Sequence, residues 1–580
     1  MTDALIRGKL WRPVVAILGV IVSLFPFLSC GSGTQSQNRL PPPGFTLTSS
    51  PNTVILQQTG SASVTVTIVP TGGFSGSVNL SASGLPSGVT ATFDPATATS
   101  TSAMDLTVSG SAPTGNAALT ITGSSSTITT TTQLNLTVLV VAQPGSLPQS
   151  FFALNNVDPT DNPSGDGMLY GAVGHPIRLA WPYIERTRGN FDFSFYDQYA
   201  AIAPREGPNG IVAVMDLTLG MTPGWAKQDQ STCRQLPDPN GPTIVGCQAP
   251  PDNLQDWKDF ITALAHHYNG SNPAQPYIKY YEIWNEWNVN DPQNGFWIGP
   301  IPELVTLQTT ACEIIHATPG PTYSLVLTPS TVGAAHNFND QAAQQLYNYL
   351  TMYGGANCPG GPNNLIDGVS FHGNLGLASL DPYPQPGEGC NGAGCNGSIE
   401  QIANAYRQVA NLSGLQTTPL LDTEGGFEAA NITDADQRAA WLAQFYILQA
   451  SLFNSNQLQW VSWFTWGAPG VAGNIETANK TPDTAGVAYT QVFSWLFGRF
   501  PAACSPNASV WTCGLTGSGG YQAAITWDDS QTCNNGTCTT SPQTAPAFAV
   551  RMRDLAGNST QITGGSQIQV GLKPIILESQ

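Results

Sequence analysis

The chain carries two kinds of hydrophobic pattern, and the first covers residues 45–140. In segments such as "SASVTVTIVP" and "TQLNLTVLVV", β-branched residues alternate with polar ones, and "GLPSG" and "SAPTGN" supply turns between them. A period of two is typical of strands that bury one face. This part of the chain is therefore predicted to be an all-β sandwich.

The second pattern begins at residue 151, where short apolar segments alternate with amphipathic helices. The helical spacing is clearest in residues 254–268, whose apolar face carries Trp257, Phe260, Ile261, Leu264 and Tyr268. The predicted strands are "FFALN", "IRLAW", "IVAVMDLTL", "YYEIW", "YSLVLT", "GVSFH", "PLLDT" and "QWVSWF". Eight strands alternating with helices across residues 151–500 predict a (β/α)8 barrel.

Linkers and a third region complete the predicted organisation. Residues 31–44, which end in "RLPPPG", and residues 141–150, which contain "AQPGSLPQ", have the composition of linkers. Residues 501–580 return to strand patterning in "YQAAITWDD", "AFAVRMRD" and "SQIQVGL". We expect a multidomain α/β chain: a β-sandwich, a TIM barrel and a small β domain packed on it.

Composition narrows the classes of partner. The net charge is −18 and only 10% of residues are charged, which argues against nucleic acid or an anionic membrane surface as the partner. It also disfavours an anionic polysaccharide unless a local basic cleft overrules it. His266 and His267 are adjacent on a predicted helix and cannot share one face, so we expect no metal, and no motif implies an organic cofactor.

Residues 1–30 have the pattern of an export signal. Arg7, Lys9 and Arg12 precede an apolar run that is too short for a comfortable membrane span. The "FLSCGSG" that follows resembles the lipobox of bacterial lipoproteins, whose cysteine is lipidated after cleavage. A lipid on Cys30 would then be the only membrane attachment; the alternative is ordinary secretion after cleavage near Ser29.

The cysteine count also suits an oxidising compartment. Of eleven cysteines, ten remain when Cys30 is set aside, and an even set favours disulfides. Proximity along the chain, with the two left over paired together, suggests these bridges: Cys233–Cys247, Cys390–Cys395, Cys504–Cys513, Cys533–Cys538 and Cys312–Cys358.

Polar and aromatic residues gather where the predicted barrel strands end. Strand two would end near Arg178 and Trp181, and strand four runs directly into Asn285, Glu286 and Trp287. The remaining exits carry His372, Glu424, Trp463 and Trp466. The carboxyl ends of barrel strands meet at one face, where barrel enzymes place their catalytic groups. Two carboxylates flanked by aromatic rings are what glycoside hydrolysis requires.

Four segments together carry a family resemblance. "EIWNEWN", "LLDTEGGF", "GVSFHGN" and "RLAWPYIERTRGNFDFS" make residues 151–500 similar to glycoside hydrolase clan A, and closest to family 39, which includes β-xylosidases and α-L-iduronidases. Residues 45–140 likewise resemble the immunoglobulin-like modules that precede secreted bacterial enzymes. A departure is Trp287, which stands where many relatives have proline.

The resemblance implies a role for each matched residue. Glu286 would be the general acid/base and Glu424 the nucleophile. Asn285 would bind the substrate 2-hydroxyl, Arg178 would orient the nucleophile and lower its pKa, and His372 would line the pocket. Six tryptophans are candidates for stacking on sugars, although each could equally be packing: Trp181, Trp225, Trp287, Trp297, Trp463 and Trp466.

Other carboxylates compete for these roles. Asp422 and Glu428 flank Glu424, and Glu282 lies deeper along the strand of Glu286, where the barrel interior is its expected place. The leading hypothesis is an exported retaining glycoside hydrolase that cleaves a plant or microbial oligo- or polysaccharide with two glutamates. The alternatives are a transglycosylase using the same residues and a non-catalytic carbohydrate-binding surface protein.

Overall fold

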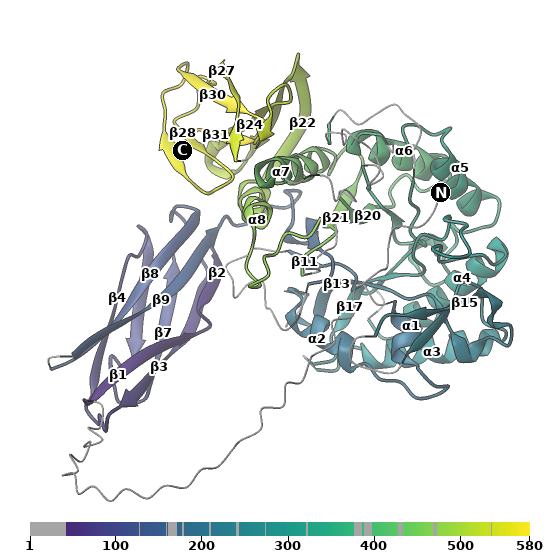
Figure 1. Ribbon diagram of the computed structural model, residues 1–580, viewed down its shortest axis with the longest axis horizontal. Helices are drawn as coiled ribbons and strands as arrows, with labels where there is room; N and C mark the ends of the chain where they lie inside the picture. The colour runs from purple at the N-terminus through teal and green to yellow at the C-terminus, as the bar shows by residue number, and fades with distance from the viewer. Residues whose placement is uncertain are drawn as a thin grey trace, which may run out of the picture.

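The structure is a computed structural model (Figure 1), and parts of the chain fall outside it. It describes residues 42–126, 128–157, 159, 171–176, 179–207, 210–238, 243–272, 274–320, 323–333, 335–375, 386–387, 397–426, 432, 434–467, 473–534 and 536–580. The export segment with Cys30, Arg178, Glu428 and the predicted Cys390–Cys395 bridge lie outside the described residues. Within those ranges, no helix combines the length and hydropathy that a membrane crossing requires.

The N-terminal region consists of two sheets around one core. One sheet has the order β1 (Gly44–Ser50), β3 (Ser61–Thr71), β7 (Thr101–Val108) and β5 (Val89–Asp94). The other has the order β2 (Thr53–Gln57), β9 (Ile128–Leu139), β8 (Gly115–Ser125), β4 (Val78–Ser83) and β6 (Thr97–Ala98). Alternate residues such as Val64 and Val66 are fully buried while the threonines between and after them face outward. The likeness to immunoglobulin-like modules stays a prediction.

Eight parallel strands form the barrel at the centre of the chain. They are β10 (Phe152–Leu154), β11 (Ala172–Val173), β13 (Val212–Thr218), β17 (Tyr277–Glu282), β18 (Leu325–Leu327), β19 (Val369–Phe371), β20 (Leu420–Gly425) and β21 (Leu458–Trp463). A continuous ladder runs in the order β18, β17, β13, β11, β10, β21, β20, β19, and the short β12 (Arg205–Glu206) pairs with β13.

The ring closes between β18 and β19 through two isolated bridges, Leu327 with Gly368 and Thr331 with Phe371. The chain therefore folds as a nearly closed (β/α)8 barrel, which confirms the predicted barrel fold. Its helices are α1 (Ala180–Ile184), α2 (Ser194–Ile202), α3 (Leu254–His267), α4 (Ile301–Ala317), α5 (Gln341–Thr351), α6 (Ile399–Leu412), α7 (Ala435–Ser451) and α8 (Thr484–Leu496).

The second strand is not where the sequence pattern placed it. The "IRLAW" segment leads into α1, which begins at Ala180, and the strand is the two-residue β11 before it. Glycines bound this strand because the chain passes others closely: a Cβ on Gly174 would lie 1.7 Å from Oδ1 of Asn155. So short a strand carries no periodic signal, and its exit is at His175 rather than at Arg178 and Trp181.

A small C-terminal β domain follows the barrel. The C-terminal sheet has the order β22 (Phe500–Asn507), β23 (Val510–Thr516), β24 (Gln522–Asp528), β31 (Ile575–Glu578), β28 (Arg551–Arg553) and β29 (Ser559–Gln561). Two further pairs are β25 (Cys533–Asn534) with β26 (Thr537–Cys538) and β27 (Thr540–Thr544) with β30 (Gln567–Gly571). This domain lies against α7 (Figure 1), where Lys573 forms an ion pair with Asp436 at 2.7 Å.

After β13 the chain forms a three-stranded sheet outside the barrel, in the order β14 (Thr222–Pro223), β16 (Ile244–Cys247) and β15 (Cys233–Leu236). Four of the predicted disulfides are present: Cys233–Cys247, Cys312–Cys358, Cys504–Cys513 and Cys533–Cys538. The first of them ties β15 to β16 beside the barrel mouth.

Candidate active site

Glu286 stands in the loop that follows β17. Its backbone φ is 37°, in the left-handed region that a residue with a side chain rarely adopts. Its backbone N–H donates to Oγ of Ser330 at 3.0 Å, and Ser330 in turn donates its own N–H to the carbonyl of Trp284 at 2.9 Å. A strained residue that neighbouring loops hold in place is a common feature of functional sites.

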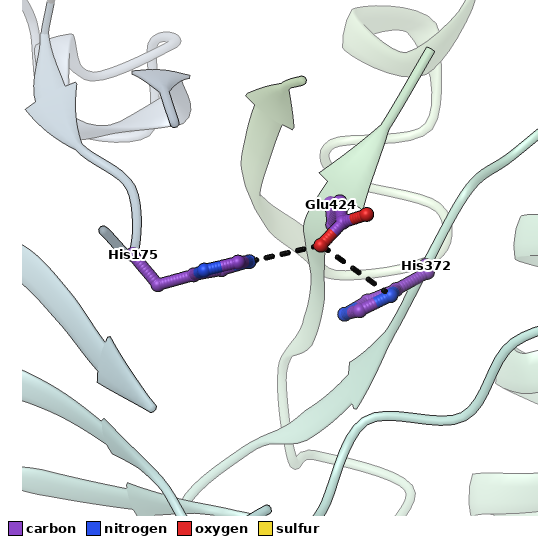
Figure 2. A group of neighbouring side chains, drawn as sticks. All are labelled: His175, His372 and Glu424. Atoms are coloured by element: carbon purple, nitrogen blue, oxygen red, sulfur yellow. Dashed lines mark hydrogen bonds and ion pairs between the residues drawn. The ribbon is translucent and has the colours of Figure 1, made fainter. Parts of the chain in front are cut away.

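Glu424 lies near the end of β20 and is held between two histidine rings (Figure 2). Its Oε2 accepts a hydrogen bond from Nε2 of His175 at 3.1 Å, and Nδ1 of His372 lies 3.9 Å from the same oxygen. The two imidazoles are nearly parallel, with an interplanar angle of 15° and ring centroids 6.3 Å apart.

His372 also contacts the other glutamate. Its Nδ1 lies 2.9 Å from Oε1 of Glu286, and its backbone N–H donates to the carbonyl of Thr331 at 2.9 Å. Because one nitrogen lies 2.9 Å from Glu286 and 3.9 Å from Glu424, the two carboxylate oxygens are no further apart than these two distances combined. A separation of about 5–5.5 Å, as in retaining enzymes, falls within that limit.

The two histidines and Glu424 shift one another's pKa values toward their charged forms. Burial lowers the pKa of His372, but the charge of Glu424 and the hydrogen bond to Glu286 outweigh it and raise that pKa to about 10. Burial also lowers the pKa of His175, and its hydrogen bond to Glu424 more than reverses the effect. For Glu424, burial raises the pKa, yet the two histidines outweigh burial and lower it. These interactions favour the carboxylate form of Glu424 and the imidazolium forms of both histidines.

A cavity of about 300 Å³ opens onto these groups. We call it the active-site cavity; it is lined by His175, Leu179, Tyr183, Arg234, Gln235, Leu236, Pro237, Asn285, Glu286, Phe296, Glu424 and Phe464. Oδ1 of Asn285 is buried and has no hydrogen-bond partner among the described residues. A buried amide oxygen without a partner is costly, and a substrate hydroxyl in the cavity could satisfy it.

One wall of the active-site cavity is the end of β15. The guanidinium of Arg234 lies 5.0 Å over the ring of Phe296, and its Nη1 donates to the carbonyl of Gln293 at 2.8 Å. The disulfide between Cys233 and Cys247 holds this strand against β16. The wall is thus fixed by a stacking contact, a hydrogen bond and a covalent bond.

Among the tryptophan candidates, Trp181, Trp287, Trp463 and Trp466 are buried and do not line the active-site cavity. Trp181 packs against Trp257 and donates its indole N–H to Glu185 at 2.8 Å. Trp287 donates to Oγ1 of Thr331 at 3.2 Å. Trp463 donates to the carbonyl of Gly473 at 2.7 Å.

Trp466 is fully buried as well. Within the described parts of the chain, the tyrosine and phenylalanine rings that line the cavity belong to Tyr183, Phe296 and Phe464, and these four tryptophans are packed in the interior.

Two of the rival carboxylates, Asp422 and Glu282, do not line the active-site cavity. Asp422 is fully buried, accepts the N–H of Gly373 at 2.8 Å, and has its pKa raised to about 7 by burial. Glu282 is fully buried inside the barrel, where it accepts hydrogen bonds from Ser370 at 2.5 Å and Thr423 at 2.7 Å. Neither is positioned to reach a substrate.

Two groups of side chains in the described residues have the composition of metal sites. His175, His372 and Glu424 present ligand atoms within 4.8 Å of one another. Because both imidazoles carry raised pKa values, they are better suited to ion pairing than to ligation. The other group contains Cys358, which is bonded to Cys312 and is not a free thiolate.

His175 is the functional candidate that the sequence pattern did not identify. It contacts Glu424 directly and lines the active-site cavity. The signal that could have found it is "GAVGHP", where a glycine and a proline bracket the histidine just after a short apolar pair. The longer apolar segment "IRLAW" follows it directly and was predicted as the strand instead.

Comparison with known proteins finds similar structures but no similar sequence. No protein-family model matches the chain, and no curated protein matches its sequence. A family 39 glycoside hydrolase from the gut symbiont Bacteroides cellulosilyticus WH2 has a similar structure, with a TM-score of 0.53 and 15% identity over 92% of this chain and 99% of that one.

Two further solved structures are similar at lower scores. The GH39 enzyme from Xanthomonas axonopodis pv. citri has a TM-score of 0.48 and 16% identity over 75% of this chain and 95% of its own. A GH30 endoxylanase from Clostridium papyrosolvens C71 has a TM-score of 0.44 and 12% identity over 75% and 98%. The first comparison shows that this chain shares the fold of a clan A glycoside hydrolase.

Proposed function

We propose that the protein is a retaining glycoside hydrolase in which Glu424 is the nucleophile and Glu286 the general acid/base. The observation that carries the proposal is that His372 contacts both carboxylates from one nitrogen, at 2.9 Å and 3.9 Å. This contact supports a short separation of the two groups and is compatible with the value of about 5–5.5 Å that double displacement requires.

In this mechanism the two histidines lower the pKa of the nucleophile Glu424. Ionised Glu424 attacks the anomeric carbon while Glu286 gives its proton to the leaving oxygen, so that a glycosyl-enzyme forms and the aglycone departs. Glu286 then takes a proton from water as that water attacks the anomeric carbon and releases Glu424. Asn285, with its unpartnered amide oxygen in the same cavity, is placed to bind a sugar hydroxyl.

The test is a panel of neutral and acidic polysaccharides and aryl glycosides, with released reducing sugar and binding measured in the same samples. Nuclear magnetic resonance would report the anomeric configuration of the first product. Hydrolysis that gives a first product with the configuration of the substrate would support the proposal. Binding without release would favour a carbohydrate-binding surface protein, and transfer to an added sugar acceptor in place of water would indicate a transglycosylase.

Export is the second part of the proposal and rests on residues 1–30 alone. The positive residues, the apolar run and the lipobox-like cysteine support an exported protein with a lipid on Cys30. In a bacterial host, wild type should fractionate with membranes and Cys30→Ser should not be membrane-bound. Equal fractionation of the two proteins would remove the lipid anchor and leave export standing.

A further inference from the structure

A second cavity, which we call the Trp225 cavity, lies beside the candidate site and has no part in the chemistry above. Its volume is about 320 Å³ and none of its lining residues lines the active-site cavity. Both volumes are at the small end of the range for ligand sites, about 300–1,000 Å³. Its polar and aromatic lining residues are Arg186, Thr187, Trp225, Gln230 and Thr243.

The two cavities are neighbours along one helix and one hairpin. On α1, Tyr183 lines the active-site cavity and its neighbour Pro182 lines the Trp225 cavity. In the hairpin, Gln235 of β15 lines the first and its register partner Val245 of β16 lines the second. The two cavities therefore share α1 and the hairpin as a common wall.

Trp225 is held rigidly at the edge of its cavity. Its indole N–H donates to the carbonyl of Glu185 at 2.6 Å, and its ring meets Trp181 edge-on at 6.3 Å and 87°. The guanidinium of Arg188 lies 5.0 Å from the ring centroid, but Arg188 does not line the cavity. Trp225 itself is half-buried and lines the cavity. A fixed indole surface of this kind is suited to the apolar face of a sugar.

The polar groups of the Trp225 cavity match hydroxyls rather than an ion. Arg186 pairs with the buried carboxylate of Asp238 at 2.8 Å, which neutralises its charge and leaves further N–H donors. The amide nitrogen of Gln230 donates to the carbonyls of Gly224 at 2.9 Å and Lys227 at 2.7 Å. Both of its hydrogens are thus used, and its oxygen remains as an acceptor.

We propose that the Trp225 cavity is a second carbohydrate-binding site that takes a neutral sugar chain and holds polymeric substrate next to the catalytic centre. The inference rests on the proposed glycosidase function and adds to it that the natural substrate is a chain long enough to reach both cavities. Tethering at the second site raises the local concentration of substrate at the first.

The experiment compares two independent variants in the full-length chain. Trp225→Ala removes the ring, while Thr187→Trp fills the cavity and leaves Trp225 in place. For each, kcat/KM is measured on the neutral polysaccharide that wild type cleaves best and on an aryl glycoside. The ratio of polymer to aryl activity should fall about tenfold, a difference of about 1.4 kcal/mol. Tyr353→Ala, an exposed aromatic after α5 that lines neither cavity, is the control and should keep the wild-type ratio.

Binding is measured separately so that the two proposals can fail separately. Native electrophoresis through gels containing arabinoxylan, glucomannan or β-glucan is run with Glu424→Ala alone and combined with each variant. The combined variants should lose most of the retardation. A cleaving wild type whose Trp225→Ala and Thr187→Trp variants keep both the ratio and the retardation would overturn the second site alone. A wild type that cleaves no glycoside would overturn the proposed function, and the gels would still decide the binding site.

Discussion

His175 donates a hydrogen bond to Glu424 at 3.1 Å although 249 residues separate them. One consequence is a predicted change in pH dependence. His175→Gln removes a charge that lowers the pKa of Glu424, so that pKa should rise. Since Glu424 must be ionised to attack, activity is lost as pH falls through its pKa. The acidic limb of the kcat/KM profile should therefore move up by about one pH unit, or about 1.4 kcal/mol.

His267→Gln is a matched control, because His267 pairs with Asp197 away from the site. An unmoved acidic limb would show that His175 only fills space.

Glu286→Ala should discriminate between leaving groups. Its proton is needed only when the leaving group is poor, so activity should fall by about 10²–10⁴-fold on a natural glycoside and much less on an aryl glycoside with an acidic phenol. Added azide should restore turnover on the aryl glycoside and give a glycosyl azide of retained configuration, because Glu424 still shields the other face. A uniform loss on both substrates would contradict the acid/base role.

Glu424→Ala should behave differently. Without a nucleophile no glycosyl-enzyme forms, so both substrates should be turned over at most at trace rates, more than about 10⁴-fold below wild type. Any rescue by azide should give the inverted product, which nuclear magnetic resonance distinguishes from the retained one. If Glu424→Ala gave the retained azide and Glu286→Ala the inverted one, the two roles would be reversed.

His372 should contribute stability that depends on pH. Its pKa in the folded protein is raised to about 10 from an ordinary value of 6.5, so its contribution is complete below the ordinary pKa and is lost as pH rises through the folded pKa. His372→Asn should therefore cost the most near pH 6, about 3–5 kcal/mol as for one partner of a buried ion pair, and less as pH approaches 10. Calorimetric melting of both proteins at the two pH values tests this; an equal cost at both would mean that His372 is neutral in the folded protein.

The four observed disulfides should differ in their effect on stability according to the loops that they close. Cys312–Cys358 has a separation of 46 residues and Cys533–Cys538 one of 5. Loop-closure entropy gives about 4 kcal/mol for the first and about 2 kcal/mol for the second. Replacing each pair by alanines and following urea unfolding should reproduce that order, and the reverse order would mean that local strain or residual structure dominates.

The parts of the site that could be predicted from sequence are those on strands with a clear pattern. Glu286, His372 and Glu424 all follow or end such strands, and the structure brings them within contact of one another. The second strand is only two residues long, too short for periodicity to reveal it, and His175 at its exit was missed for that reason.

The tryptophans could not be placed from sequence for a different reason. A tryptophan beside a strand end is equally able to stack on a ligand or to pack while donating its N–H to a neighbour. Trp181, Trp287 and Trp463 do the latter, and only three-dimensional contacts distinguish the two cases. Of the rings that line the cavity, Phe296 comes from a loop and Tyr183 from the short helix α1, and neither segment carries a strand pattern.

The ladder between β18 and β19 is incomplete, so we expect local opening to disturb the position of Glu286 more often than that of Glu424. Glu424 belongs to β20, which is paired along both edges, whereas Glu286 is held by Ser330 on one side of the open seam and by His372 on the other. Local openings start where backbone pairing is sparse, so the amides of Thr328 and His372, which bond across the seam, should exchange with deuterium before those of β20 and β21. Each opening separates the two groups that hold the proton donor, and because His372 also lies beside Glu424, it exposes the nucleophile's charge while its strand stays paired.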